Sequence, residues 1–416
     1  MSFVLNLWKE KREMGDTKCN KDGWVKKKLG DCFSYIKNGA NIKQEKDAGG
    51  IPITRIETLS NGIFNRDRLG YAGIEDTDKY ESYILESGDL LFSHINSKKY
   101  IGRTVVYQKK DGEQIIHGMN LLKLKVQSGV LLPFFAFYQF MSDRIKEQIA
   151  SHRKDAVNQS SISISDLKKV SLIIPSLAEQ QHIVSELDCL NGIIEKQKEQ
   201  LKQLDELAQS IFYDMFGDPV ENEMGWEFFK LSNICDKITD GTHNSPKTYT
   251  QGDYLYVTAK NIKPDGFDFS DISYVSRDVH IPIYARCNPE LGDVLYIKDG
   301  ATTGIAMINN LTEEFSLLSS VALLKVNRDQ LVNYYLKYLL NNSSKYAEIR
   351  GMMGGAAITR LTITKIKDIK IPVPPLALQQ AFASKIEAIE HQKELIKKSI
   401  AETETLFNSR MDYYFG

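Results

Sequence analysis

The chain has 416 residues, of which 42% are hydrophobic and 26% are charged, and its formal net charge is −1. This length allows two to four domains with their own cores, and the composition is ordinary for a globular protein. No apolar run is long enough to span a bilayer, and the run from Met1 to Trp8 is too short for a signal peptide, so we expect a cytoplasmic protein. The five cysteines form no Cys-x-x-Cys pair, which argues against a zinc site.

Charge is sorted along the chain, although its total is close to zero. Residues 1–175 carry 28 Lys and Arg against 21 Asp and Glu, a net charge of +7. Residues 176–218 carry 3 against 9, a net charge of −6. A basic first part is compatible with phosphate binding, but a solvated mixed surface explains the excess equally well.

The first part of the chain consists of an extension, residues 1–21, and a module, residues 22–175. Short β-branched or aromatic runs broken by Gly, Asn and Asp predict a β-rich α+β domain for the module. Its landmarks are, in order, Gly23-Trp24, a strand-like run at 51–56, a turn at Asn61-Gly62, the turn Gly88-Asp89, a helical stretch at 134–149 and a strand that ends at Pro175.

A long helix is predicted for residues 176–218. Its apolar positions follow alternating three- and four-residue steps over more than four heptads, which is typical of a coiled coil. These positions are Ile183, Leu187, Leu190, Ile194, Leu201, Leu204, Ala208, Ile211 and Met215, interrupted only by Gln197. Ser176 and Glu179 fit a capping box, and Gly217-Asp218-Pro219 ends the helix.

The second half of the chain repeats the first. A second module, residues 219–374, has the landmarks Gly225-Trp226, a strand-like run at 254–259, the turn Gly292-Asp293, a helical stretch at 331–349 and a strand that ends at Pro374. The segment from Leu378 to Gly416 then repeats Glu179 to Gly217 without a gap, 199 positions later. We therefore predict a second long helix over 375–416, with polar breaks in its seam at Lys393, Thr403 and Arg410.

The two helices are expected to pair with each other. A helix of about 38 residues is roughly 57 Å long, which is longer than a 150-residue domain is wide, so a helix that faces only its own module's core is the less favoured alternative. Antiparallel pairing would place the modules at opposite ends. The predicted pairing residues are Leu187, Leu190, Ile194, Leu201 and Leu204 of the central helix and Ile386, Ile389, Ile396 and Ile400 of the C-terminal helix.

The usual signatures of catalysis are missing from the sequence. It contains no phosphate-binding loop and no G-x-G-x-x-G, and its seven histidines show no metal-ligand spacing. The stretch Pro264-Asp265-Gly266 lacks the Glu-x-Lys that a nuclease motif would need, so it is read as a turn. We predict no catalytic residues and no metal site.

Two β-rich modules, each followed by a long helix that begins at a proline and reaches Gln-Gln, resemble the specificity subunits of type I restriction-modification enzymes. The resemblance covers about residues 22–416, and its motifs are Pro175-Ser-Leu-Ala-Glu-Gln-Gln181, Pro374-Pro-Leu-Ala-Leu-Gln-Gln380 and the two Gly-Asp turns. Pro375 and Leu378 depart from the first copy, which affects the local helix cap.

The resemblance implies a subunit without catalysis, in which each module is a target recognition domain for one half of a bipartite, asymmetric DNA site. The fold would be α+β, with two similar β-rich domains joined by two long helices that pair as an antiparallel coiled coil. The helices would set the spacer and dock two methyltransferase subunits, and a restriction subunit would complete the complex. S-adenosylmethionine, ATP and Mg would be held by the partners, with no cofactor in this chain.

The loops after the matched Gly-Asp turns differ between the copies and are rich in side chains that read bases or bind phosphates. The candidate DNA-binding residues of the first module are Lys43, Arg55, His94, Asn96, Lys98, Lys99, Arg153, Lys154, Asn158 and Gln159. Those of the second are His243, Asn244, Lys247, Lys298, Asp299, Thr302 and Arg360. Two alternatives stay open at this point: a coiled-coil scaffold that does not bind DNA, and an enzyme with a cryptic methyltransferase site.

Overall fold

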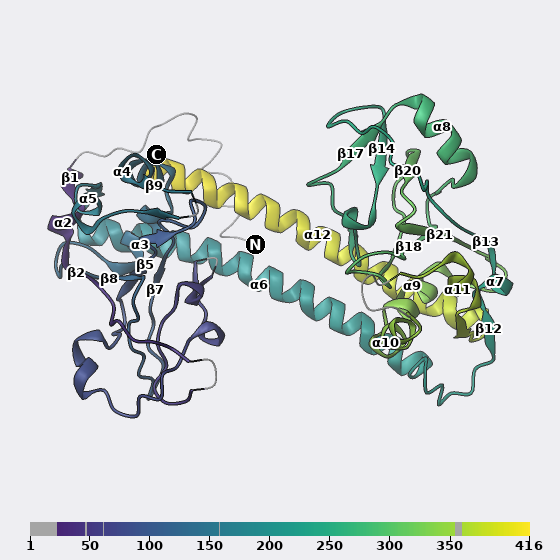
Figure 1. Ribbon diagram of the computed structural model, residues 1–416, viewed down its shortest axis with the longest axis horizontal. Helices are drawn as coiled ribbons and strands as arrows, with labels where there is room; N and C mark the ends of the chain where they lie inside the picture. The colour runs from purple at the N-terminus through teal and green to yellow at the C-terminus, as the bar shows by residue number, and fades with distance from the viewer. Residues whose placement is uncertain (1–22, 46–47, 61, 158, 354–359) are drawn as a thin grey trace. The chain divides into compact units, whose positions relative to one another are not determined.

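The computed structural model describes residues 23–45, 48–60, 62–157, 159–353 and 360–416. The extension predicted at residues 1–21 therefore lies outside the described residues. The chain divides into two compact units: the first comprises residues up to 196 together with 399–416, and the second comprises residues 197–398. Each unit holds one β-rich module and part of both long helices, α6 (Leu177–Phe216) and α12 (Leu376–Phe415) (Figure 1).

The first module is built around an antiparallel four-stranded sheet with the strand order β2-β8-β5-β7. Its strands are β1 (Val25–Lys28), β2 (Phe33–Asn38), β3 (Leu59–Ser60), β4 (Ile63–Phe64), β5 (Leu90–Phe92), β6 (Ile95–Asn96), β7 (Thr104–Val106), β8 (Leu122–Val126), β9 (Lys154–Asp155), β10 (Ser160–Ser161) and β11 (Ser171–Ile174). Its helices are α2 (Leu29–Cys32), η1 (Ile56–Thr58), η2 (Arg66–Arg68), η3 (Asp78–Tyr83), α3 (Pro133–Met141), α4 (Asp143–His152) and α5 (Ile164–Leu167).

The second module repeats this sheet as β13-β21-β18-β19, with a register shift at the same place, between Cys235 and Lys237 as between Phe33 and Tyr35. Its strands are β12 (Phe228–Lys230), β13 (Cys235–Asp240), β14 (Tyr254–Val257), β15 (Ile262–Lys263), β16 (Gly266–Phe267), β17 (Ser273–Val275), β18 (Val294–Ile297), β19 (Ala306–Ile308), β20 (Phe315–Leu317), β21 (Val321–Val326) and β22 (Lys370–Pro372). Its helices are α7 (Leu231–Ile234), η4 (Ala259–Asn261), α8 (Arg277–Arg286), α9 (Asn333–Asn341), α10 (Ser343–Gly351) and α11 (Ile363–Asp368).

The structure corrects two details of the predicted elements. The run at 51–56 is not a strand: it makes isolated bridges and then enters η1. Pro52 has no amide proton to donate to a ladder, and Thr58 Oγ1 accepts a hydrogen bond from the Arg55 amide at 2.9 Å, which turns the chain. Each predicted helical stretch before the closing strand is two helices, broken at Ser142 and at Asn342, where Asn342 caps α10.

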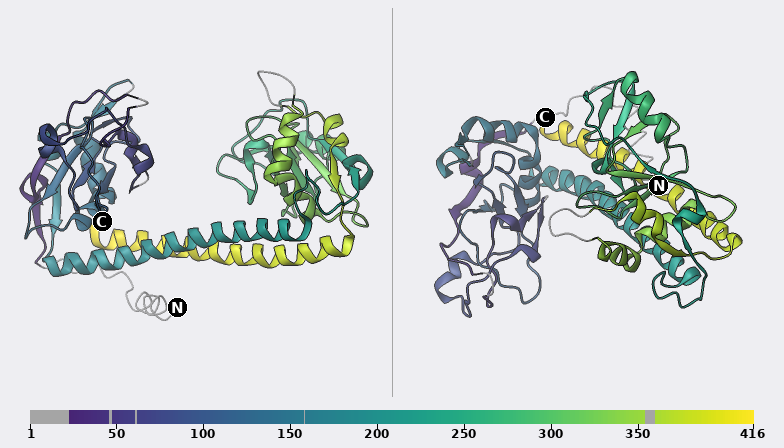
Figure 2. Two further views of the ribbon diagram at one scale, coloured as in Figure 1. Left: turned by 90° about the horizontal axis from the view of Figure 1, so that it is seen from below. Right: turned by 45° about the vertical axis from the view of Figure 1, so that its right-hand side comes forward.

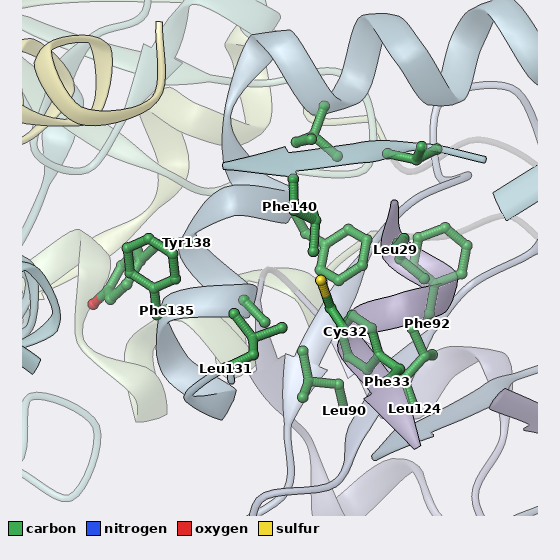
Figure 3. Close-up of a cluster of buried hydrophobic side chains, with 14 of the residues drawn as sticks. Leu29, Cys32, Phe33, Leu90, Phe92, Leu124, Leu131, Phe135, Tyr138 and Phe140 are labelled. Atoms are coloured by element: carbon green, nitrogen blue, oxygen red, sulfur yellow. The ribbon is translucent and has the colours of Figure 1, made fainter. Parts of the chain in front are cut away.

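The core of the first unit joins the sheet, α2, α3 and both long helices. Phe92 of β5 packs against Phe140 of α3 with ring centroids 5.5 Å apart, above the buried Cys32 (Figure 3). Leu187 of α6 and Phe415 of α12 belong to the same cluster of buried side chains. Each fully buried side chain of this size stabilises the fold by about 1.5–3 kcal/mol. The helix ends thus complete the core of the module, which the seam pattern alone did not predict.

A buried glutamine fastens each long helix to its module. Gln180 accepts a hydrogen bond from the Leu132 amide at 2.9 Å and donates to the Val130 and Pro175 carbonyls at 2.9 and 3.1 Å. Gln379 does the same with the Val332 amide at 2.9 Å and with two carbonyls at 3.1 and 2.8 Å. Both glutamines are fully buried. The repeated Gln-Gln motif is therefore explained by its first residue, which satisfies backbone groups at the base of α3 or α9.

The two long helices pack against each other within each unit, in antiparallel fashion. In the first unit the start of α6 lies beside the end of α12, and in the second unit the end of α6 lies beside the start of α12 (Figure 2). The predicted fold class, two similar β-rich modules joined by two long helices that pair antiparallel, is confirmed.

Candidate functional site

The Gly-Asp turns place the candidate loops in the same way in both modules. Gly88 and Gly292 have φ of +91° and +90°, and the following aspartates each accept a hydrogen bond from the amide three residues earlier, at 2.9 and 2.8 Å. The turn leads into the inner strand β5 or β18, and the divergent loop begins where that strand ends. Glycine is needed here because other residues rarely adopt this φ.

His94 and Lys298 occupy equivalent positions at the ends of these strands. Each backbone carbonyl accepts a hydrogen bond from the residue that precedes the last short helix of its module, Ile162 at 2.9 Å and Leu361 at 2.8 Å. The outer strand of the sheet also matches. Asn38 and Phe92 pair with the same residue of β8, Leu122, and Asp240 and Tyr296 pair with the same residue of β21, Ala322. One framework therefore carries Asn38 and His94 in the first unit, and Asp240 and Lys298 in the second.

In the second unit, these positions hold a continuous ionic network. Lys298 Nζ lies 3.4 Å from Asp240 Oδ2 and donates to Asp299 Oδ2 at 3.1 Å. Arg286 Nη2 donates to Asp240 Oδ1 at 2.6 Å, and Arg360 Nε lies 3.0 Å from Asp299 Oδ1. The Lys298 and Asp240 side chains are 2% and 3% exposed, whereas those of Arg286 and Arg360 are 52% and 53% exposed. We call these five residues the Lys298 network.

The structure brings four of the predicted residues of the second module together in or beside this network. Lys298, Asp299 and Arg360 belong to it, and His243 Nε2 lies 3.1 Å from Asp240 Oδ2. The remaining candidates, Asn244, Lys247 and Thr302, are exposed in the neighbouring loops. The burial of Lys298 argues against a direct contact between its side chain and DNA, and favours a supporting role for it.

In the first unit, the equivalent site holds no comparable network among the described residues. His94 is buried, and this burial lowers the pKa of its imidazole to about 4, so the ring is neutral at pH 7. Asn96 donates to Ser93 Oγ at 3.1 Å, while Lys98 and Lys99 are exposed. A neutral, buried His94 supports the loop and does not itself present a charge.

The β9–β10 hairpin brings the second group of candidates beside this loop, because β10 pairs with β6. Arg153 makes two contacts with Asp155, at 2.6 and 3.1 Å, and its side chain is only 13% exposed. Its guanidinium is therefore engaged within the hairpin. Lys154 and Gln159 are exposed, and Asn158 lies outside the described residues.

Lys43 and Arg55 lie in another part of the first module. Arg55 lies beside Gly70, which forms a bridge with Ile53, and 3.7 Å from Glu57; Lys43 precedes Gln44, whose side chain also lies beside Gly70. Both lysine and arginine are exposed there. The structure thus separates these two predicted residues from the loop that follows β5.

Sequence reasoning missed two members of the Lys298 network, Asp240 and Arg286, which both precede the divergent loop in the chain. Asp240 is the last residue of β13 and Arg286 the last of α8. A lone Asp and a lone Arg separated by 46 positions give no sequence signal. It also missed Arg103, whose guanidinium lies 4.0 Å from the centre of the Tyr100 ring beside the exposed Lys99.

The helix seam holds the predicted pairing residues at two levels of burial. Leu187, Leu190, Ile194, Ile386 and Ile389 are buried, and the partly buried remainder is Leu201, Leu204, Ile396 and Ile400.

Within each unit, polar side chains pair across the seam. In the first unit Arg410 donates hydrogen bonds to the Glu186 carboxylate through Nε and, at 2.9 Å, through Nη2. Tyr414 donates to the same carboxylate at 2.5 Å. In the second unit Lys393 donates to Asp205 at 2.7 Å. Such polar pairs at seam positions fix the register of paired helices.

Among the described residues, no group of three or more His, Cys, Asp and Glu side chains could hold a metal ion. No helix in the part of the chain that the structure describes is long and apolar enough to cross a membrane. What the fold presents is a pair of related β-rich modules with divergent polar loops, joined by paired helices. This arrangement is typical of proteins that use two related domains to bind two different targets.

Comparison with known proteins gives the family. The model of the type I restriction modification DNA specificity domain matches twice, at residues 21–205 and 223–405. A putative type I restriction enzyme specificity subunit of Methanocaldococcus jannaschii, MjaX, is 30% identical, over 97% of this chain and 96% of that protein. The EcoKI specificity subunit of Escherichia coli is 24% identical over 44% of this chain and 40% of that protein. The crystal structure of a type I system S subunit from M. genitalium has the same fold, with a TM-score of 0.55, 15% identity and coverage of 97% and 98%.

The chain therefore belongs to the family of type I restriction enzyme specificity subunits. It is a non-catalytic DNA-recognition subunit, whose family works with DNA and with partner restriction-modification subunits. The family supports the DNA-binding interpretation and not the alternative of a scaffold that does not bind DNA.

Proposed function

We propose that each unit reads one half of a bipartite, asymmetric DNA site, that the paired helices set the spacer between the halves, and that they dock two methyltransferase subunits. The observation that carries the proposal is that the two repeats hold different polar groups at one equivalent position. The same strand end presents a neutral, buried His94 in the first unit and the Lys298 network in the second. Two similar frameworks with different polar groups are expected to prefer different base sequences.

The predicted DNA-binding residues divide into two roles on this proposal. Exposed cations such as Lys98, Lys99 and Lys247 would bind phosphates and position the unit on the duplex. Exposed residues held beside the strand ends, such as Arg360, which forms a bridge with Asp299, would contact base edges. S-adenosylmethionine, ATP and Mg would be bound by the partner subunits, since the proposal gives this chain recognition and no chemistry.

The test is a selection from random-sequence duplex DNA with the reconstituted complex of this chain and its methyltransferase partner. We expect enrichment of two unlike half-sites separated by a fixed gap. Enrichment of a single or symmetric motif, or of none, would contradict the proposal. Incubation of the isolated chain with S-adenosylmethionine and DNA is the companion measurement, and methyl transfer there would show that the chain has a catalytic site of its own.

A further inference from the structure

We propose that Arg286 and Arg360 of the second unit each read a guanine, and that the buried Lys298 is the positioning residue that orients both. The inference rests on the proposed DNA-reading function and adds to it the base class and the residues responsible. It is carried by the contacts of the Lys298 network. Two half-exposed arginines stand at the two ends of a chain of charges whose centre is buried.

The contact between Arg360 and Asp299 leaves the reading end of the arginine available. The carboxylate lies 3.0 Å from Nε, the inner nitrogen, and the Arg360 side chain is 53% exposed. The terminal Nη1 and Nη2 groups form a planar two-donor fork, which matches the O6 and N7 acceptors of guanine in the major groove. A lysine has the same charge but no fork, so charge and geometry can be separated experimentally.

Arg286 is held from the other end of the network. Its Nη2 donates to Asp240 Oδ1 at 2.6 Å, and the Asp240 carboxylate is only 3% exposed. Because the carboxylate is fixed inside the protein, the half-exposed guanidinium starts from a restricted set of orientations. An arginine that is already ordered loses less side-chain entropy when it binds than a free surface arginine does.

Lys298 explains why two carboxylates can sit at this place. Its Nζ lies between Asp240 at 3.4 Å and Asp299 at 3.1 Å, and its side chain is 2% exposed. Without the lysine, two partly desolvated carboxylates would repel each other and would no longer hold the arginines in place. Lys298 therefore acts through the two aspartates and is a positioning residue that does not touch DNA.

The alternative role for these arginines is phosphate binding, and the two roles predict different results. Loss of a base-reading arginine changes the preference at one position of the site, whereas loss of a phosphate contact weakens binding to all sequences alike. The first unit provides an internal reference in the same molecule, because its half-site should not respond to changes in the Lys298 network.

The experiment repeats the random-DNA selection with the reconstituted complex carrying Arg286→Lys, Arg360→Lys, Lys298→Met or Lys298→Arg. Arg277→Lys is the matched control, since Arg277 is an exposed arginine at the opposite end of α8. We expect each of the two arginine variants to lose about tenfold or more of the guanine preference at one position of the second half-site. Lys298→Met should lose it at both positions, Lys298→Arg should retain it in part, and Arg277→Lys should change nothing.

The outcomes separate this inference from the proposed function. A wild-type complex that enriches no bipartite site overturns the proposed function itself. A bipartite site without guanine in the second half, or variants that bind all sequences more weakly with an unchanged base preference, overturns only the inference. If Lys298→Met does not fold, as a melting curve would show, Asp299→Asn replaces it, because that variant keeps the Lys298–Asp240 pair and releases Arg360 alone.

Discussion

The two units carry different side chains at a place where their backbone pairing matches, at the ends of β5 and β18. The first unit buries an imidazole there, and the second buries a lysine between two aspartates. The surrounding backbone hydrogen bonds are the same, 2.9 Å from Ile162 to His94 and 2.8 Å from Leu361 to Lys298. The difference teaches that the duplicated framework fixes where a polar group stands and leaves its chemistry free, as two recognition surfaces require.

The junction between module and helix shows the opposite behaviour. Gln180 and Gln379 make the same three hydrogen bonds in both units. These bonds satisfy buried backbone groups that are present in both copies of the fold. Both units therefore have the same residue, glutamine, at this position. The helix seam lies between these two cases. Both units have a polar pair across the seam, but Arg410–Glu186 and Lys393–Asp205 are at positions that do not correspond in the repeat.

The largest expected effect comes from changing the separation of the two units. Seven residues inserted in each helix, after residue 196 in α6 and after residue 398 in α12, keep the heptad pattern and add about 10 Å. The preferred spacer should lengthen by roughly three base pairs, and the original site should no longer be methylated. Mapping of methylated sites in cells that express the variant complex measures this. An unchanged spacer would show that the helices do not measure the gap.

Unlike the buried glutamines, which bond to backbone groups, the seam pairs join two side chains. We therefore expect the effects of substituting the two partners on stability to be strongly coupled. Arg410→Met removes the cation from a Glu186 side chain that is only 9% exposed, and the loss should be about 3–5 kcal/mol in the free energy of unfolding. Glu186→Gln with Arg410→Met should cost less than the sum of the two single changes. A urea-unfolding double-mutant cycle decides this, and strictly additive losses would mean that the pair is not coupled.

Substitution of the two buried glutamines tests whether the junctions between module and helix contribute equally to the stability of the two units. Gln180→Leu and Gln379→Leu each leave one amide and two carbonyls buried without partners, so each should destabilise its unit by about 2–3 kcal/mol. Urea unfolding gives the losses. Gln181→Leu and Gln380→Leu, at the exposed neighbours, are matched controls with little expected effect. A large difference between the two buried sites would contradict the equivalence.

The smallest effect should be a pH dependence confined to the first unit. The pKa of His94 is lowered to about 4 by burial, below its ordinary value of 6.5, so the unfolded state takes up the proton first as the pH falls. Stability should therefore be full above pH 6.5 and be lost toward pH 4, by about 1 kcal/mol at pH 5.5. His94→Gln should reduce this loss without removing it, because burial also lowers the pKa of His117, to about 3. An equal pH dependence in wild type and variant would exclude His94 as its source.

Several features of the protein follow from its sequence alone. The 199-residue repeat, the heptad seam, the Ser176 cap and the stop at Gly217 are local patterns, because helix periodicity and capping depend on residues a few positions apart. These patterns predict two α+β modules and two long paired helices. They also identify the loops after the Gly-Asp turns as the places where the copies diverge.

Only the tertiary structure decides what those loops contain. The Lys298 network joins the last residue of β13, the last residue of α8 and the two residues after β18 with Arg360. These residues come from separate segments of the chain, and the ends of β13 and β18 come close because both strands pair with β21, one on each side of it. Burial then divides charged residues that look alike in the sequence: Lys298 lies inside, and Lys98 is exposed. The physical reason is that exposure and ion pairing are properties of packing between distant segments, and no local pattern encodes them.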